Sequence, residues 1–597
     1  MKRLLVLLSA LTALSLNAAD RPNILWITSE DNASHWLGCY GNTQVRTPAL
    51  DALAKNGIRF QNAYSNAPVC AVARSTILNG AYAPTMGTQH MRSRYPIEKK
   101  FKPYVTYLRE AGYFCTNRSK TDYNFAGNDS ALWDKANHYS KRKDGQPFFC
   151  IFNFTSSHES SLFTKKKSSI TYIKPEEVNV APYLPDLPEI RSDLARYHGV
   201  MKQLDDQVAK VLADLERDGL AEDTIIFYYA DHGGILPRGK RYLKDTGAKI
   251  PMIVHFPSKW QHLSPFKPGS TPEEPVAFVD LAPTLLSIIG IEKPKQMQGR
   301  ALLGSKRVEP AKDEMEFLYS DRFDEINGMR RGLTDGRWKY IHRFTPHLPA
   351  APYSFYQFGQ DGWMGYRKAW QEGKLKPEHA RMWEAPQAVQ ELFDTRKDPW
   401  EINNLAGKME HGEQLAKMRK ALIARMIQVR DTSMVPESLF EAFAKGEPVS
   451  ARLAEREDMA ELVNLAFDAT SGDPGYLDKF ITAMKSDDML TRYWGAHACL
   501  VLGKDAKQAS EALLKLTKDP QAGIRITAAH ALHTMGHDQS DLLVAELRKD
   551  SPHQAKLAAI NSLWALGLDK KVPADTLKTL TKSKDGYVSR FSKRLLE

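Results

Sequence analysis

The stretch R-P-N-I-L-W-I-T-S at residues 21–29, followed by Glu30 and Asp31, decides the fold class. It is a nearly continuous apolar run bounded by proline and acids, which is typical of a strand buried on both faces of a parallel sheet. Residues 146–156 and 223–230 repeat the pattern, the latter as D-T-I-I-F-Y-Y-A. The sequence therefore predicts at least three buried strands.

Helical patterns alternate with these runs. Residues 47–57 begin with Thr47 and Pro48 and stop at Gly57, as a short helix does, and residues 193–218 carry apolar side chains at helical spacing before Gly219. The alternation predicts an α/β fold: an open, mostly parallel sheet sandwiched by helices. Functional residues of such sheets collect at the carboxyl ends of the strands. The candidates directly after predicted strands are Glu30, Asp31, His158, Asp231 and His232.

The second half of the chain reads differently. Residues 328–344 predict a hairpin around Thr-Asp-Gly, and residues 391–406 add a short strand and a turn, so we expect a small antiparallel sheet. Residues 342–384 are dense in aromatic residues, Pro and Arg, and we interpret them as a long loop over the site. From about residue 450 only helical periodicity remains.

Three similar units occur in this last region and end at Gly503, Gly536 and Gly567. They resemble HEAT-type repeats, in which stacked helix pairs bury their apolar faces together. An unrelated helical bundle is the alternative. Since stacked repeats bury their apolar faces mostly against each other, we expect this region to be separable from the rest of the chain.

Composition narrows the class of protein. Residues 1–19 have a basic start, a short apolar run and small residues at the end, which predicts a signal peptide and hence a periplasmic or secreted protein. No later apolar run is long enough to span a membrane. The formal net charge of +11 favours anionic partners, but no nucleic-acid recognition motif is present. Solubility alone is the other explanation of this charge.

The stretch A-P-V-C-A-V-A-R-S-T-I-L-N-G at residues 67–80 places Cys70 four residues before Arg74. Taken alone, this is equally consistent with a buried structural cysteine at a helix start. With the motifs that follow it in order up to about residue 406, it resembles the signature of the type I, formylglycine-dependent sulfatases of the alkaline-phosphatase-like superfamily. The resemblance implies that Cys70 is oxidised to formylglycine, whose hydrated aldehyde attacks sulfur.

The resemblance also implies a metal site and a set of catalytic groups. The expected metal ligands are Glu30, Asp31, Cys70, Asp231 and His232, a mainly hard-oxygen set that suits Ca²⁺, with Mg²⁺ as an alternative. The expected catalytic residues are Cys70, Arg74, Lys120, Asp122, His158 and Lys240, with Lys244 as the alternative to Lys240. Two positions depart from the family pattern: Val72 stands where Pro or Ala is usual, and Asp122 stands where a histidine is usual.

These observations predict an exported sulfatase that hydrolyses sulfate esters of a glycan and depends on a formylglycine-generating maturase. The expected divisions are a signal peptide (1–19), a catalytic α/β domain (20–310), a C-terminal subdomain (311–445) and HEAT-like repeats (450–597), the last a candidate surface for a protein or glycan partner. Two alternatives stay open. One is a phosphodiesterase or phosphonate hydrolase on the same fold; the other is a catalytically impaired binding protein.

Overall fold

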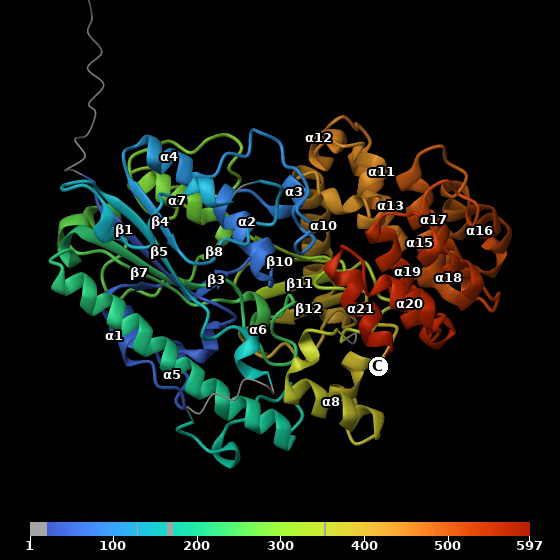
Figure 1. Cartoon of the computed structure of the whole chain (residues 1–597), viewed down its shortest axis with the longest axis horizontal. Helices are drawn as coiled ribbons and strands as arrows, with labels where there is room; N and C mark the ends of the chain where they lie inside the picture. Colours follow the sequence, from blue (N-terminus) through green and yellow to red (C-terminus); the bar gives the residue numbers. More distant parts are fainter. Residues whose placement is uncertain (1–20, 128, 164–170, 352–353, 597) are drawn as a thin grey trace, which may run out of the picture.

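The computed structural model describes residues 21–127, 129–163, 171–351 and 354–596, so the expected signal peptide lies outside the described residues. A six-stranded sheet forms the centre of the first half (Figure 1). Its order is β2 (Ile58–Arg59), β7 (Met252–His255), β6 (Thr224–Ala230), β1 (Asn23–Ser29), β5 (Phe148–Phe154) and β4 (Phe114–Arg118). The four strands from β6 to β4 are parallel, while β7 runs antiparallel to both β6 and β2. The predicted open, mostly parallel sheet is confirmed.

Side chains of β1 alternate between two hydrophobic clusters, which explains why the whole strand is apolar. Ile24 and Trp26 belong to the cluster that includes residues of α2 (Cys70–Asn79), α4 (Tyr104–Glu110) and α7 (Leu281–Ile288). Leu25 and Ile27 belong to the cluster with α1 (Pro48–Asn56) and α5 (Pro188–Arg217). Helices therefore cover both faces of the sheet (Figure 1).

The register of the central strands sets the position of the site. Ser29, the last residue of β1, pairs with Phe154 at the end of β5 and with Ala230 at the end of β6. Three neighbouring strands thus end at one level. The segments that follow them therefore leave the sheet at a single edge, as the strand pattern of the sequence predicts.

The predicted antiparallel sheet is present, with four strands. They are β9 (Glu316–Ser320), β10 (Arg330–Thr334), β11 (Trp338–Arg343) and β12 (Gln390–Asp394), in the order β12-β11-β10-β9. Gly336, in the turn between β10 and β11, has a φ of 90°, which an L-residue adopts only with strain. Helix α10 (Gly412–Gln428) packs on β10 and β11. A separate two-stranded parallel sheet joins β3 (Asn62–Tyr64) to β8 (Pro275–Ala277).

The interpretation of residues 342–384 as a long loop is wrong. The segment contains α8 (Asp361–Gln371) and α9 (Pro377–Ala380). Trp363, Tyr366 and Trp370 recur on one face of α8 and all pack against Trp383. The aromatic residues therefore form a small core of their own. Tyr356, before α8, does lie near the edge of the sheet where β1, β5 and β6 end, which we call the catalytic edge because the expected catalytic residue His158 lies there; its ring is 6.2 Å from that of His158.

The expected helical region follows the second sheet. Its α-helices are α11 (Phe440–Ala444), α12 (Val449–Ala454), α13 (Met459–Ala469), α14 (Leu477–Ala483), α15 (Met489–Leu502), α16 (Ser510–Leu516), α17 (Ala522–Thr534), α18 (Ser540–Arg548), α19 (His553–Ala565), α20 (Ala574–Leu580) and α21 (Gly586–Leu596). Gly503, Gly536 and Gly567 follow α15, α17 and α19 with positive φ, as stop residues do. The short helices α3 (Ala83–Met86) and α6 (Asp245–Ala248) complete the set. The HEAT-like nature of the region and the domain boundaries stay predictions.

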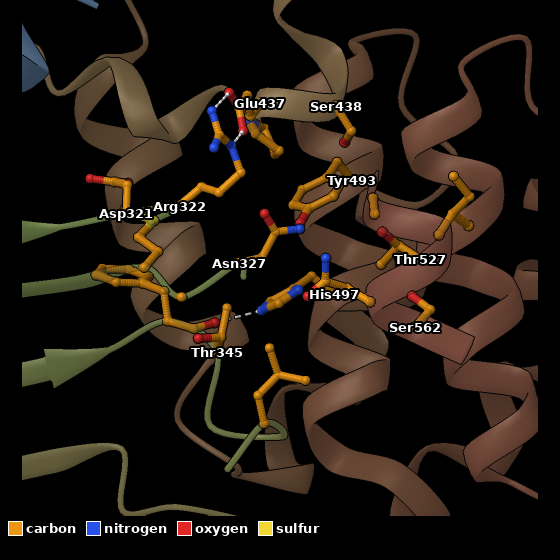
Figure 2. Close-up of a pocket in the computed structure, with 18 of the residues that line it drawn as sticks. Asp321, Arg322, Asn327, Thr345, Glu437, Ser438, Tyr493, His497, Thr527 and Ser562 are labelled. Carbon is orange, nitrogen blue, oxygen red and sulfur yellow. Dashed lines mark hydrogen bonds and ion pairs between the residues drawn. The ribbon is translucent and has the colours of Figure 1, made fainter. Parts of the chain in front are cut away.

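The expectation that this region is separable is wrong, because it shares a hydrophobic core with the second sheet. One cluster runs from Tyr64 through the second sheet and on to Phe591 in α21. In the zone shown in Figure 2, His497 Nε2 donates to the Phe344 carbonyl at 2.7 Å. Trp494 Nε1 donates to the Met434 carbonyl at 3.0 Å. The sequence could not reveal this packing, because apolar faces do not identify their partners.

Three histidines lie together in this interface. The ring centroid of His347 is 5.4 Å from that of His497 and 5.5 Å from that of His530. Burial lowers the pKa of all three, to about 4 for His497 and about 3 for His530. They are therefore uncharged in the folded protein at neutral pH.

We expect acid to destabilise this interface. Between pH 6.5 and about 4, the three histidines are protonated in the unfolded chain but not in the folded protein. The free energy of unfolding therefore falls as the pH falls, by up to about 1.4 kcal/mol per pH unit for each histidine. Denaturant unfolding at pH 7 and pH 5 measures the effect. His530→Gln should flatten the dependence, while His537→Gln, at an exposed position of the same region, should not. Equal stability at both pH values would contradict this expectation.

All five cysteines are free in the structure. Among the residues that the structure describes, no helix combines the length and the apolar character that a membrane span requires.

Candidate active site

Asp31, Asp231 and His232 lie together at the edge of the sheet where β1, β5 and β6 end. One potential ligand atom of each lies within 4.8 Å of the others, and all three side chains are buried. The Tyr197 hydroxyl donates to the Asp31 carbonyl at 2.6 Å and holds the segment after β1. Asp31 has a φ of 50°, an unfavourable conformation for a non-glycine residue, and such strain is common at functional sites.

The His232 ring is oriented for a cation. Its Nδ1 donates to the Gly233 carbonyl at 3.0 Å, which leaves Nε2 buried without a hydrogen-bond partner, 3.0 Å from Asp31 Oδ1 and 3.7 Å from Asp231 Oδ1. Burial by itself lowers the pKa of the imidazole, but the charges of Asp231 and Asp31 outweigh it and raise the pKa to about 10. The cluster thus favours positive charge. Two carboxylates and an imidazole nitrogen fit a divalent cation.

Lys240, rather than Lys244, lies at this edge. Its Nζ is 3.1 Å from Asp31 Oδ2 and 3.5 Å from Glu159 Oε1. Burial opposes the charged amine, but Asp31 and Glu159 raise the pKa of Lys240 well above its usual value. Lys244 instead pairs with Glu391 of the second sheet at 3.0 Å. Burial lowers its pKa to about 8.

Arg74 and Lys120 neutralise the carboxylates on the other side. Arg74, one turn into α2, contacts Asp231 Oδ2 at 3.1 Å, Glu30 Oε1 at 3.4 Å and the Asn153 side-chain oxygen at 2.7 Å. The Lys120 amine pairs with Glu30 Oε1. The Glu30 carboxylate therefore faces two cations and is not part of the Asp31–Asp231–His232 cluster. Its role as a metal ligand stays a prediction.

Cys70 is the first residue of α2 and is fully buried. Its Sγ lies 3.5 Å from Asp122 Oδ2 and 3.8 Å from Arg92 Nη2. Arg92 holds the Asp122 carboxylate at 2.9 and 3.1 Å. Although burial raises the pKa of Asp122, this guanidinium keeps it well below the usual value. At the position where the family has a histidine, the chain thus places a carboxylate that holds its charge and a paired arginine.

His158 follows β5 at the same edge and is partly buried. Its Nδ1 lies 3.0 Å from Ser160 Oγ. Burial and the nearby charge of Lys240 lower the pKa of His158. The ring is therefore neutral at pH 7, which suits a group that exchanges one proton with the substrate.

A second layer of charged residues, which no sequence motif indicated, lies behind these groups. Arg241 binds Glu159 through two hydrogen bonds of 2.9 and 2.8 Å and contacts Asp324 at 2.7 Å. Arg241 and Glu159 directly follow two predicted site residues, so adjacency was a usable signal. Asp324 and Arg92 had none, since tertiary structure alone brings them here.

Comparisons with known proteins decide the family. Residues 22–115 and 114–291 match the Sulfatase family, and residues 238–362 match the C-terminal part of N-sulphoglucosamine sulphohydrolase. The chain is 35% identical over 482 residues to an ulvan-active sulfatase of Formosa agariphila, covering 71% of this chain and 78% of that protein. The chain belongs to the sulfatase family.

More distant relatives agree. Human N-sulphoglucosamine sulphohydrolase is 23% identical, over 67% of this chain and 89% of the relative. A solved 2-O GAG sulfatase superposes with a TM-score of 0.51 at 19% identity, over 69% of this chain and 93% of that structure. The superposition shows the alkaline-phosphatase-like fold, and the chain is a sulfuric ester hydrolase of the type I sulfatases.

The geometry of this sulfatase suits an anionic sulfuryl group. Four cationic side chains, those of Arg74, Arg92, Lys120 and Lys240, surround the edge where Cys70 lies. Each is paired with a carboxylate, so their positions are set before substrate arrives. Prepositioned donors and charges stabilise developing negative charge without reorganisation.

Proposed function

We propose that this protein is an exported sulfatase that removes sulfate esters from a saccharide, with Cys70 converted to formylglycine and a divalent cation bound beside it. The observation that carries the proposal is the position of Cys70, at the start of α2 next to Asp122 and Arg92 and close enough to His232 to influence the pKa of that ring. A cysteine with only a structural role would not need this surrounding of paired charges.

Asp31, Asp231 and His232 would hold the cation, with Glu30 and the modified Cys70 as further ligands. Ca²⁺ fits the carboxylate-rich set best, and Mg²⁺ is the alternative. The cation supplies charge neutralisation, and formylglycine supplies a hydroxyl nucleophile. Val72, which replaces the usual Pro or Ala, lies inside α2 with its side chain buried, so we expect the unfolded chain to present it to the maturase.

The chain's own residues would bind the sulfuryl oxygens and move protons. Arg74 and Lys120 neutralise the oxygens, and Lys240 or His158 protonates the leaving alcohol. Asp122 is a poor base because Arg92 keeps its pKa low. In the family the histidine usual at this position acts as the base that assists sulfate release. We assign that step to another group, and assign Asp122 to hold Arg92 near the nucleophile.

The substrate class follows from relatives and charge. Relatives are named for ulvan, glucosamine and hexuronate sulfates, all sulfated saccharides. The net charge of +11 favours such polyanions, and the signal-peptide pattern of residues 1–19 supports a location in the periplasm or outside the cell. We also propose that the catalytic domain ends at residue 310 and the C-terminal subdomain at residue 445. The helices from residue 450 onward would then form HEAT-like repeats that offer a surface for a glycan or protein partner.

One experiment tests the reaction and the cation together. The purified protein should release sulfate from 4-nitrophenyl sulfate much faster than it cleaves a matched aryl phosphodiester. Exhaustive chelation should remove the activity and Ca²⁺ should restore it, and calorimetry should show weaker Ca²⁺ binding by Asp231→Asn, which loses one charged oxygen ligand. Asp218→Asn, at a surface ion pair with Arg217, is the matched control. Preference for the phosphodiester, or full activity and no calcium binding after chelation, would overturn the proposal.

A further inference from the structure

The last helix of the chain, α21, reaches the catalytic edge. Its residue Tyr587 is buried between two guanidinium groups. Arg590, one turn later, lies 4.6 Å from the ring centroid, and Arg322 lies 4.8 Å from it. Arg322 in turn pairs with Glu437 (Figure 2). A helix from the end of the chain is thus anchored on the loop that follows β9.

Two routes connect α21 to the reacting groups. The first runs through Arg92, whose Nη2 is 3.8 Å from Cys70 Sγ. Arg92 directly follows Met91, whose carbonyl accepts a hydrogen bond of 3.0 Å from the Arg322 guanidinium that lies over the Tyr587 ring. In the second, Arg590 Nη2 lies 3.9 Å from Asp324 Oδ1, and Asp324 binds Arg241, the neighbour of Lys240. On this second route Asp324 and Arg241 lie between Arg590 and the catalytic Lys240.

The donors of this group are not fully used within the described part of the chain. Tyr587 Oη and Arg590 Nε are buried and have no hydrogen-bond partner there. The distance of 3.9 Å between Arg590 and Asp324 is too long for a hydrogen bond. The side chains of Arg92 and Arg590 are 40% and 30% exposed, so a solute can reach both. A buried hydroxyl without a partner, on a ring that an accessible guanidinium group contacts, is an arrangement that an anionic group would complete.

We propose that Arg92, Tyr587 and Arg590 form an anion-binding subsite beside Cys70, which binds a second negatively charged group of the substrate, a carboxylate or a further sulfate. This inference rests on the proposed function. It assigns the helical region a direct part in substrate selection, because α21 supplies two of the three residues. The sulfate that is cleaved would bind at Arg74, Lys120 and Lys240, and the second charge would bind at α21.

The test uses the full-length enzyme and compares substrates that differ in one charge. The substrates are 4-nitrophenyl sulfate and a set of uronate-containing disaccharides, each monosulfated, disulfated, and monosulfated with the carboxyl group reduced to an alcohol. Arg590→Gln removes the charge, Arg590→Lys retains it, and Tyr587→Phe removes only the hydroxyl. Lys593→Gln is the matched control, because Lys593 is an exposed cation of the same helix.

For the disaccharide that the wild type cleaves fastest, Arg590→Gln should lower kcat/KM by roughly 10- to 100-fold, as expected for the loss of a charge-assisted hydrogen bond. The loss should appear mainly in KM, and Arg590→Lys should recover part of it. Activity on 4-nitrophenyl sulfate should change less than about twofold. A loss confined to carboxylate-bearing substrates identifies a carboxylate, and a loss confined to disulfated ones identifies a second sulfate.

Several outcomes would overturn the subsite. An equal loss of Arg590→Gln activity on the aryl sulfate and on the disaccharides would show a structural role. No loss for Arg590→Gln on any substrate, or the same loss for Lys593→Gln, would show that Arg590 binds no substrate charge. Cleavage of the aryl sulfate but of no disaccharide would show that the enzyme does not act on such substrates. A wild type that cleaves no sulfate ester would instead contradict the proposed function. The two failures are therefore distinguishable.

Discussion

Cys70→Ala is expected to abolish sulfate ester hydrolysis, with a loss on the order of 10⁴-fold or more, because it removes the group from which the nucleophile is made. The fold should persist, since alanine is a good helix former and the lost atom is small. Sulfate release from 4-nitrophenyl sulfate measures the activity, and thermal unfolding measures the stability. The mass of the peptide that contains residues 67–80 should show conversion to formylglycine in the wild type only.

Cys115→Ala is the matched control. Cys115 is also fully buried, but it lies in β4 with its Sγ directed to the Tyr113 carbonyl, away from the paired charges. Cys115→Ala should change the activity little, and it should change the stability by about as much as Cys70→Ala does. Undiminished turnover in Cys70→Ala, or a wild-type peptide with unmodified cysteine in an active enzyme, would end the formylglycine proposal.

Deletion of residues 450–597 is expected to yield an insoluble or unfolded protein. The hydrophobic core of the second sheet continues into α13, α15, α17 and α19, so the deletion would expose a large apolar surface. Each large side chain uncovered costs about 1.5–3 kcal/mol, and a few of them exceed the total stability of about 5–15 kcal/mol of a typical domain. Soluble expression and circular dichroism of the truncated chain measure the outcome.

A single substitution tests the same interface more gently. Trp494→Ala should lower the free energy of unfolding by about 3–5 kcal/mol, because it leaves a cavity and frees the Met434 carbonyl. Leu514→Ala, on the 46% exposed Leu514 of α16, should change it by about 0.5 kcal/mol or less. A truncated protein that folds and cleaves 4-nitrophenyl sulfate at the wild-type rate would show that the two parts are independent after all.

The central strands illustrate what local sequence can determine. Predicted residues 21–29 and 223–230 became β1 (Asn23–Ser29) and β6 (Thr224–Ala230), because a strand buried on both faces must be apolar throughout. The strand pattern also predicted that Asp31, Asp231 and His232 lie at one edge of the sheet, where the structure brings them together. That success has a physical basis, since parallel strands bring their carboxyl ends together.

Other features depended on contacts between segments far apart in the chain. The pairing of Arg92 with Asp122, the turning of Glu30 toward Arg74 and Lys120, and the approach of Arg590 to Asp324 have no local pattern. Charged side chains look alike in a sequence whether they face solvent or each other. Their partners are chosen only when the sheet, the second sheet and α21 pack together.

The sequence by itself determined the α/β class, the position of the catalytic edge and the sulfatase signature, because periodicity and motif order are local properties of the chain. Only the tertiary structure decided that Lys240 rather than Lys244 serves that edge, that Asp122 is held by Arg92, and that the helical region shares a core with the second sheet. These features depend on which apolar faces and which charges are buried against each other. The energetic cost of burying an unpaired charge arises only in the folded state, so the pairing is settled there.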